Sequence, residues 1–355
     1  MEAKGADVGA VRDEDAFNTA AVDAWLRANA QGFNPTGLPS VQQFSKGASN
    51  LTYQLTYPEQ ALILRRPPAG AKIASAHDMG REFRVQRALK PSFPSVPTML
   101  AHCADESVIG NEFYVMEKLD GTILRSRIPS DLGLDAAGLG DLCRSFIDNL
   151  VTLHAVDPSQ PDLAAIGRGE GYVGRQVAGW SKRYRAARTW NVPTFERVMA
   201  WLDANQPADV ANCVIHNDYR LDNVVLAPND PRRIIGVLDW EMATLGDPLM
   251  DLGGAMAYWV EAGDDRAMKA LKRQPTDAPG MLTRDEVVAY YAERSGRPVD
   301  DWRFYEVFGL FRLAVIIQQI YRRYHLGQTT NPTFKRYWLA VHYFDWRCRR
   351  LIRSA

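Results

Sequence analysis

Apolar and polar positions in the first third of the chain follow the pattern of short strands. Three apolar, β-prone runs are separated by the polar segments SKGASN and PEQ, and this spacing predicts an antiparallel meander. Two further runs after the segment PSFPSVPTM predict another pair of strands. The predicted strands are Val41–Phe44, Leu51–Tyr57, Ala61–Arg65, Leu100–Cys103 and Glu112–Lys118.

Helical spacing of apolar residues predicts one helix before these strands, one between the third and fourth, and a largely helical remainder. The first dozen residues are predicted to be disordered. The predicted helices are Asp15–Ala30, Ala76–Leu89, Leu134–Ala155, Tyr172–Arg188, Thr194–Asn205, Thr283–Ser295, Asp301–Tyr324 and Thr333–Leu351.

The stretch VIHNDYRLDNVVLAPNDPRRIIGVLDWEMATLGDPLMDL interrupts the helical pattern with chemically demanding side chains. A short strand at Cys213–Ile215 leads into a polar loop, and a predicted hairpin follows, with strands at Val224–Leu226 and Ile234–Leu238 around the turn APNDPRR. Asp218 and Asn223 then lie at the two ends of one loop, and Asp239 follows the next strand. This order predicts that three oxygen-bearing side chains converge.

These residue types suit phosphoryl transfer. Magnesium takes a few carboxylate or amide oxygens together with phosphate oxygens, so Asn223 and Asp239 make a magnesium site. A further carboxylate can accept a hydroxyl proton, and H-x-D-x-x-x-x-N followed by a metal-binding Asp is the corresponding pattern. The alternative is that His216, Asp218 and Asn223 occupy an ordinary polar turn.

The second motif, DWEMATLGDPLMDL from Asp239 to Leu252, extends the pattern. With it the chain resembles the aminoglycoside phosphotransferase-like family of the protein-kinase-like fold. It looks closest to the kinase-like domain associated with some acyl-CoA dehydrogenases, because it shares their SN, LR and DYRLDN features. The resemblance implies a bilobal α+β fold, with an antiparallel sheet and a helix in a nucleotide-binding N-lobe (1–118) and a mainly helical C-lobe (119–355).

The resemblance assigns roles in the catalytic loop. Asp218 becomes the catalytic base or the residue that orients the hydroxyl, Arg220 a cation facing the transferred phosphate and His216 a brace of the loop, while Asn223 and Asp239 hold Mg²⁺. Further along the chain, Asp251 resembles the residue that ties this loop to the next helix.

Two other positions, one inside the motif and one outside it, need a separate interpretation. Asn217 stands where Gly is usual, which leaves the local backbone conformation open. His154 lies at the end of a predicted helix, where a lone histidine is more often structural than catalytic.

In the N-lobe, the third strand ends on Arg65 at the position of the usual lysine. Arg65 can grip phosphate or carboxylate with two parallel bonds, and strand alternation places Arg66 on the opposite face. Glu82 is its expected partner on the following helix. The alternative for Glu82 is a surface pair with Arg81 or Arg84.

The other predicted nucleotide contacts are weaker. Ser49 and Asn50 in SKGASN can meet the phosphates, although the single glycine there, Gly47, favours an ordinary hairpin turn. Met116, Glu117 and Lys118 resemble the hinge that contacts adenine, and they can equally be plain strand residues.

Charge and cysteine content narrow the function classes. The 42 basic and 42 acidic residues balance, so there is no global case for nucleic acid or for a cationic membrane anchor. The charged N-terminus lacks a signal-peptide core, and no run approaches the ~18 apolar residues of a membrane span, so a cytoplasmic location is expected. The four cysteines show no paired spacing, which argues against a metal cluster or disulfide framework.

Together these patterns predict an ATP- and magnesium-dependent phosphotransferase that acts on a hydroxyl group of a small molecule. GDPLMDL leads straight into a helix with no activation segment, which argues against protein substrates. Residues 301–355 carry ten Lys and Arg against three acids, so the substrate is expected to be anionic, such as a hydroxy acid or hydroxyacyl thioester. Basic solvent faces of amphipathic helices explain the same charges. The rival function is a nucleotide-binding pseudokinase or scaffold, which the arginine at position 65 and the glycine-poor loop favour.

Overall fold

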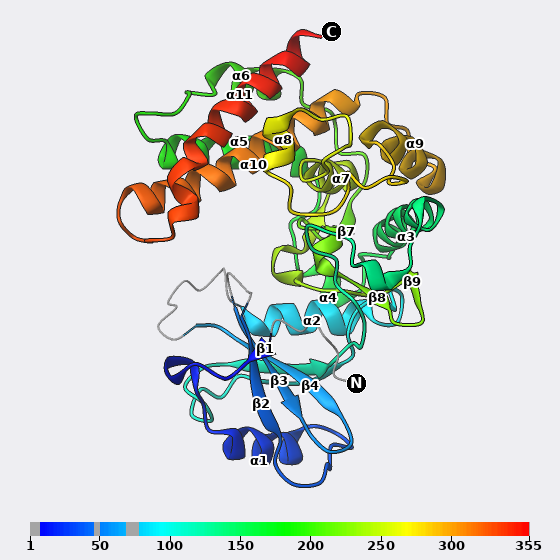
Figure 1. Ribbon diagram of the computed structural model, residues 1–355, viewed down its shortest axis with the longest axis vertical. Coiled ribbons are helices and arrows are strands. Elements are labelled where there is room, and N and C mark those ends of the chain that lie inside the picture. Colours follow the sequence, from blue (N-terminus) through cyan, green and yellow to red (C-terminus); the bar gives the residue numbers. More distant parts are fainter. Residues whose placement is uncertain (1–7, 46–49, 69–77, 355) are drawn as a thin grey trace. The chain divides into compact units, whose positions relative to one another are not determined.

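The computed structural model describes residues 8–45, 50–68 and 78–354 (Figure 1). The chain divides into two compact units. The N-terminal unit comprises the described residues of Met1–Asp120 together with Ile235–Glu241, and the C-terminal unit comprises Gly121–Ile234 and Met242–Ala355. The boundary expected from the sequence, at residue 118, did not include the return of the segment Ile235–Glu241 to the first unit.

A six-stranded antiparallel sheet forms the frame of the N-terminal unit. Its order is β1-β2-β3-β4-β6-β5, so the predicted meander is confirmed. The strands are β1 (Val8–Gly9), β2 (Ser40–Phe44), β3 (Leu51–Thr56), β4 (Ala61–Arg66), β5 (Met99–Cys103) and β6 (Phe113–Glu117).

The prediction of disorder over the first dozen residues is wrong where the structure describes them. Val8 and Gly9 pair with Phe44 and Gln43, and the backbone N–H of Arg12 donates to the Gln43 side chain. These contacts form along the edge of β2 that does not pair with β3. The backbone groups of an edge strand are available for pairing with another segment, and no local sequence pattern predicts which segment that will be. Residues 1–7 of that prediction lie outside the described part.

One helix packs on each face of this sheet (Figure 1). Helix α1 (Thr19–Asn29) shares a core with Leu62 and Leu64 of β4, whereas α2 (Met79–Leu89) packs against Ile63. Strand alternation therefore sends Arg65 to the α2 face and Arg66 to the α1 face. Helix α2 begins at Met79 with the Asp78 side chain as N-cap, and the predicted start at Ala76 lies outside the described residues.

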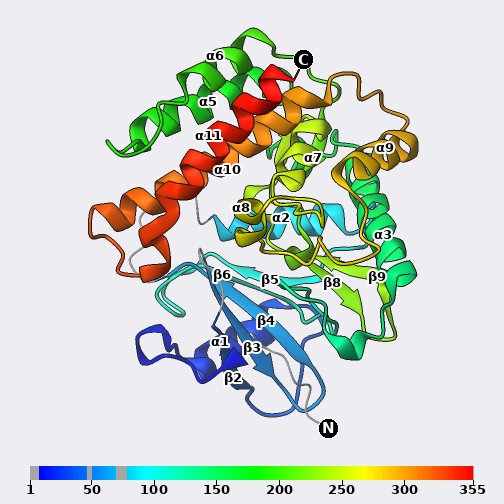
Figure 2. The same ribbon diagram turned by 45° about the horizontal axis from the view of Figure 1, so that its top comes forward.

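The C-terminal unit is mainly helical (Figure 2). Its helices are α3 (Ala136–His154), α4 (Pro161–Ala164), α5 (Tyr172–Ala187), α6 (Glu196–Ala204), α7 (Pro248–Met256), α8 (Arg266–Ala270), α9 (Arg284–Ser295), α10 (Trp302–His325) and α11 (Tyr337–Arg353). Two small sheets pair β7 (Cys213–Ile215) with β10 (Thr244–Gly246) and β8 (Val224–Ala227) with β9 (Asp230–Val237).

In the C-terminal unit the strands differ from the prediction mainly at β9 and β10. Strand β9 begins at Asp230, inside the predicted turn, because Pro231 is tolerated in a ribbon whose outer edge needs no donor. Strand β10 was not predicted, since its three residues gain their conformation only by pairing with β7. The last helix begins at Tyr337, after a 3-10 turn at Pro332–Arg336.

Helix α10 is the core of the C-terminal unit and packs against α5, α7 and α11. It is the one helix among the described residues that is long and apolar enough to cross a membrane, but 72% of its apolar window is buried inside the protein, as in the core helix of a globular fold. Helices α7 and α10 cross closely at two glycines: a Cβ on Gly309 would come within 2.2 Å of the Gly253 carbonyl oxygen.

This crossing generates a stability prediction. Gly309→Ala should lower the free energy of unfolding by about 1–3 kcal/mol, because two packed helix backbones must separate. Gly179→Ala is the matched control, since it also lies within a helix but its Cβ would meet only the flexible end of Arg183 at 4.0 Å. The control should leave stability unchanged or raise it by up to ~1 kcal/mol. Urea unfolding measures both, and equal effects of the two substitutions would contradict the close crossing.

Candidate active site

Arg65 of β4 and Glu82 of α2 form a buried ion pair in the N-terminal unit. Arg65 Nη1 lies 2.5 Å from Glu82 Oε1, and the two side chains are 11% and 2% exposed. The predicted pair is therefore confirmed, and the surface alternative for Glu82 is wrong. Burial raises the pKa of the Glu82 carboxyl, and the neighbouring Arg65 guanidinium acts in the opposite direction.

Asp239 contacts the same guanidinium. Arg65 Nη2 donates to Asp239 Oδ1 at 3.2 Å, so one arginine bridges a buried carboxylate and one that is 36% exposed. Asp239 has a φ of +69°, in the left-handed region that is unfavourable for side chains other than Gly, Asn and Asp. A strained backbone conformation of this kind persists where the surrounding structure imposes it. Here it directs the Asp239 carboxylate toward Arg65.

Arg66 serves a different purpose. It is 3% exposed, and its Nη2 donates to the backbone carbonyl of Asp15 and to the Tyr53 hydroxyl. These contacts lie on the α1 face of the sheet, so Arg66 is not placed to substitute for Arg65.

Of the other residues predicted to contact the nucleotide, Ser49 lies outside the described residues, and those that the structure describes already contact other parts of the protein. Asn50 is 4% exposed and its Nδ2 donates to Glu241 at 3.4 Å, while Ser49 and Gly47 lie outside the described residues. Met116 packs in the core beneath α2. The Glu117 N–H already donates to Thr98, so it is not free for an adenine edge, and the Lys118 side chain pairs with Asp120.

In the C-terminal unit, Asp251 of α7 holds the start of the catalytic loop. Its carboxylate accepts the backbone N–H groups of His216 and Asn217, each at 2.8 Å, and a contact from His154 Nε2 at 3.2 Å. Burial by itself would raise the pKa of Asp251, but the bonds from His154 and the loop outweigh it and keep that pKa below its ordinary value. His154 also contacts the Tyr291 hydroxyl, so its predicted structural role is supported.

Asn217 adopts the left-handed conformation that a glycine would take there, with a φ of +64°. Asn is among the few residues that tolerate this region. Its side chain accepts from the Tyr172 hydroxyl at 3.0 Å and donates to the Met242 carbonyl at 3.1 Å. The departure from the family pattern therefore leaves the loop conformation intact.

The loop brings Asp218 and Asn223 together. Asn223 Nδ2 donates to the Asp218 carbonyl at 2.9 Å and to Asp218 Oδ2 at 3.0 Å, and Arg220 lies 3.4 Å from the same oxygen. His216 is fully buried, and its Nδ1 accepts the backbone N–H of Asp218. Arg220 also pairs with Asp222 at 3.1 Å. The carboxylate of Asp218 is 24% exposed and can reach a ligand.

The side-chain oxygens of this loop also fit a metal cation that takes its remaining ligands from the oxygens of a bound molecule. Because Asn223 uses its amide nitrogen on Asp218, its amide oxygen points elsewhere and accepts no hydrogen bond from the described residues. The described part of the chain contains no cluster of three or more His, Cys, Asp or Glu that could hold a metal by itself. Magnesium sites with only one or two protein ligands plus phosphate oxygens match this chemistry.

A comparison with models of protein families shows which family the chain belongs to. Residues 40–287 match the model of the phosphotransferase enzyme family, APH. The chain belongs to this phosphotransferase family.

Relatives of this family member are longer proteins named for another activity. The chain is 35% identical to mouse acyl-CoA dehydrogenase family member 10 over 325 residues, covering 91% of the chain and 30% of that protein. It is 33% identical to human acyl-CoA dehydrogenase family member 11 over 333 residues, covering 92% of the chain and 42% of that protein. The chain thus spans less than half the length of these relatives.

Solved structures agree on the α+β protein-kinase-like fold. A candidate aminoglycoside phosphotransferase from Ralstonia eutropha JMP134 is 32% identical with a TM-score of 0.82, covering 96% of this chain and 99% of that one. A choline kinase from Cryptosporidium parvum, at 13% identity and a TM-score of 0.63, covers 95% and 97%. The second likeness concerns the fold alone.

Sequence reasoning missed residues that complete the C-terminal half of the site. Gln274 accepts the backbone N–H of Leu221 at 2.6 Å from a segment far along the chain. Tyr258 lies against Arg220, and Arg312 donates to the Asn217 carbonyl at 2.6 Å. Gln274 and Tyr258 carry no sequence signal, whereas the arginine inside the apolar run GLFRLAV is one that could have been noticed.

The buried pair in the N-terminal unit predicts a non-additive response. Glu82→Gln should lower the free energy of unfolding by roughly 3 kcal/mol, because it leaves a buried guanidinium with one carboxylate fewer. The double substitution Arg65→Met with Glu82→Leu should cost much less than the sum of the single changes, since no buried charge is then left unpaired. Urea unfolding of Glu82→Gln, of the single variants Arg65→Met and Glu82→Leu, and of the double variant measures this, and additive losses in the cycle would show that the pair is not a unit.

Proposed function

We propose that the chain is a small-molecule kinase that transfers the γ-phosphoryl group of magnesium-bound ATP to a hydroxyl group. The observation that carries the proposal is the catalytic loop, where Asn223 and Arg220 both contact the carboxylate of Asp218 and Asp251 holds the backbone before it. The loop carries the His, Asp and Asn of the pattern H-x-D-x-x-x-x-N, which supports the proposal.

In the proposed reaction, the acceptor hydroxyl oxygen forms a bond to the γ-phosphorus while the bond from that phosphorus to the bridging oxygen of ADP breaks. Asp218 orients the hydroxyl and accepts its proton, and ADP leaves with the electrons of the broken bond. Most of the acceleration comes from positioning and electrostatics, so the rigidity of the loop matters more than the reactivity of any one group.

Magnesium would be held by Asn223 and Asp239, and it would neutralise charge on the phosphates. The amide oxygen of Asn223 and the half-exposed carboxylate of Asp239 are the available ligands. Arg65 takes the position of the usual lysine, and its bond to Asp239 supports a role beside the phosphates. Arg220 supplies a second positive charge beside Asp218.

The acceptor is proposed to be an anionic hydroxyl compound, such as a hydroxy acid or hydroxyacyl thioester, and the cytoplasm is the proposed location. The names of the relatives support an acyl substrate. The basic side chains of α5 do not, because Lys182, Arg183, Arg185 and Arg188 are exposed and Arg185 pairs with Glu196. For that helix, a basic solvent face is the better explanation.

The second candidate function is a nucleotide-binding pseudokinase, which the arginine at position 65 favours. Such a protein would bind nucleotide without releasing ADP. Screening hydroxyl compounds, including kanamycin-type amines and hydroxyacyl-CoA compounds, for magnesium-dependent ADP release separates the two functions. ADP release with no member of a broad panel, despite nucleotide binding, would favour the pseudokinase.

The division of roles between the two aspartates gives a sharper test. Asp218→Asn should lower turnover by roughly two orders of magnitude or more while nucleotide binding barely changes, because it removes the proton acceptor. Asp239→Asn should instead weaken magnesium-nucleotide binding. Steady-state kinetics and nucleotide titrations of both variants measure this, and equal loss of nucleotide affinity in both would overturn the assignment.

A further inference from the structure

Helix α10 carries a buried arginine beside the catalytic loop. Arg312 is 7% exposed and lies among apolar residues of the helix, and its Nη2 donates to the Asn217 carbonyl at 2.6 Å. The close crossing of α7 and α10 makes room for it: a Cβ on Gly254 would come within 2.9 Å of Arg312 Nη1. The helix packing thus delivers a fixed positive charge to the residue that precedes Asp218.

Arg312 has no acidic partner in the part of the chain that the structure describes. Its recorded contacts are the Asn217 carbonyl and the ring of Trp180, whose centroid lies 5.3 Å from the guanidinium carbon. Arg65, in contrast, contacts two carboxylates. A guanidinium has five N–H donors, and a buried charge without a counter-charge is costly. The arrangement therefore suits an anion that the described residues do not supply.

Tyr258 provides a neutral donor beside Arg220 of the same loop. The Arg220 guanidinium lies 4.7 Å from the centre of its ring, and the Tyr258 hydroxyl makes no hydrogen bond within the described ranges. Burial raises the pKa of this phenol, the charge of Asp218 raises it further, and Arg220 and Arg312 oppose both. The phenol therefore keeps its proton at neutral pH and can donate a hydrogen bond.

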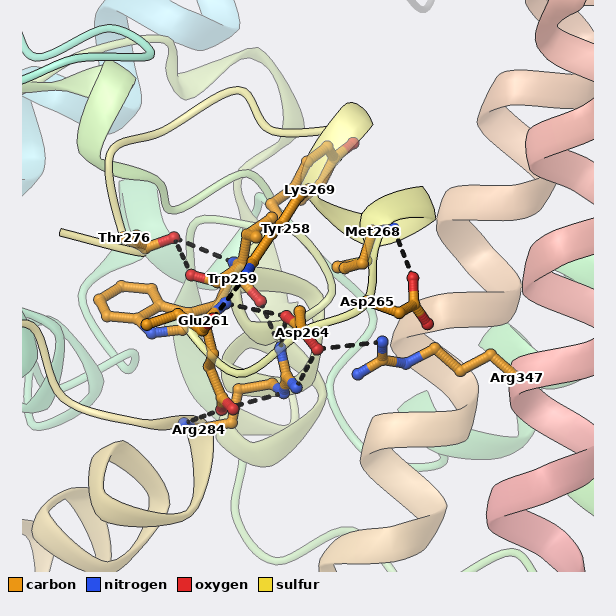
Figure 3. A network of polar contacts seen from close by, with 12 residues as sticks. Tyr258, Trp259, Glu261, Asp264, Asp265, Met268, Lys269, Thr276, Arg284 and Arg347 are labelled. Atoms are coloured by element: carbon orange, nitrogen blue, oxygen red, sulfur yellow. Dashed lines mark hydrogen bonds and ion pairs between the residues drawn. The ribbon is translucent and has the colours of Figure 1, made fainter.

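The segment that follows Tyr258 is held firmly (Figure 3). The Thr276 hydroxyl bonds both the N–H and the carbonyl of Val260. Arg284 donates to the Trp259 carbonyl and to both oxygens of Asp264, which also accepts from Arg347 of α11. These contacts fix the backbone next to Tyr258, so its position does not depend on a ligand.

We propose that Arg312 and Tyr258 together bind an anionic oxygen group of the phosphoryl acceptor and so determine that the substrate is negatively charged. The inference rests on the proposed function, because it assumes an acceptor beside Asp218. A planar guanidinium with unused donors binds carboxylate or phosphate oxygens through paired bonds, and the phenol adds a third donor. Arg312 is then the specificity-determining residue, and Asp218 acts on the hydroxyl of the same molecule.

The test compares charged acceptors with neutral ones that carry the same hydroxyl. The probes are hydroxybutyrates with the hydroxyl at each carbon position, their primary amides, and the matching hydroxybutyryl-CoA thioesters. The variants are Arg312→Gln, Arg312→Lys and the control Arg183→Gln, which removes an exposed arginine from the same Trp180 ring, at 4.6 Å. Initial rates and the heat of probe binding to the full chain are both measured.

Arg312→Gln should lower kcat/KM for the charged acceptor by roughly 30-fold, mainly through KM, with a much smaller effect on the amide and on the KM for ATP. Arg312→Lys should recover part of the loss, and Arg183→Gln should match the unchanged chain. A loss for the free acid identifies a carboxylate as the bound group, whereas a loss for the thioester alone identifies the phosphates of CoA.

Several outcomes would overturn the inference. If Arg312→Gln lowers the rates with acid, thioester and amide equally, Arg312 only positions Asn217. If the unchanged chain binds and uses amides as well as acids and thioesters, there is no charge selection. Failure of the proposed function is separate: anion binding that depends on Arg312, without phosphorylation of any probe, would leave this site in place and remove the kinase assignment.

Discussion

A single buried carboxylate, that of Asp251, determines the conformation of the catalytic loop. It accepts two consecutive backbone N–H groups, at His216 and Asn217, and is itself positioned by His154. Two consecutive amides can point to one carboxylate only if the chain turns sharply after His216, and Asn217 makes that turn in the left-handed region. Because the pKa of Asp251 lies below its ordinary value, this anchor is ionised at neutral pH and is lost only when the pH falls through that lowered pKa.

The rest of the C-terminal unit supports this anchor. His154 ends α3, Asp251 lies on α7, and the Tyr291 hydroxyl of α9 contacts the other ring nitrogen of His154. Helix α7 in turn packs on α10 through glycines, which brings Arg312 to the Asn217 carbonyl. The loop thus accepts a positive group on one side of Asn217 and donates to a negative group on the other, so its orientation is set by charge as well as by packing.

The two buried arginines illustrate what the sequence could and could not reveal. The pairing of Arg65 with Glu82 was predictable, because strand and helix periodicities each determine which face a side chain occupies. The same periodicities located the meander and most helices. Arg312 lies within a clear helical pattern too, but its neighbours come from segments distant in the sequence, and periodicity does not indicate which helices cross.

The strands and site residues that the sequence did not predict were missed for similar physical reasons. Strands β1 and β10 are two and three residues long, and they exist only through pairing with β2 and β7. The roles of Tyr258 and Gln274 depend on a segment whose backbone is held by Asp264, Arg284 and Thr276 rather than by regular structure (Figure 3). Motif residues were found because their order along the chain is constrained by chemistry, whereas supporting residues need only the correct position in space.

The most direct test of this account is amide hydrogen exchange at His216 and Asn217 in the Asp251→Asn variant. A neutral amide at residue 251 cannot accept both N–H groups as strongly, so exchange at these two positions should accelerate by about tenfold or more relative to the unchanged chain. Asp264→Asn is the control, because its side chain is also buried, at 6% exposed against 1% for Asp251, and contacts Arg284 rather than the loop. Accelerated exchange at 216 and 217 in the Asp251 variant alone is the predicted result; unchanged exchange there, or the same acceleration in the control, would contradict it.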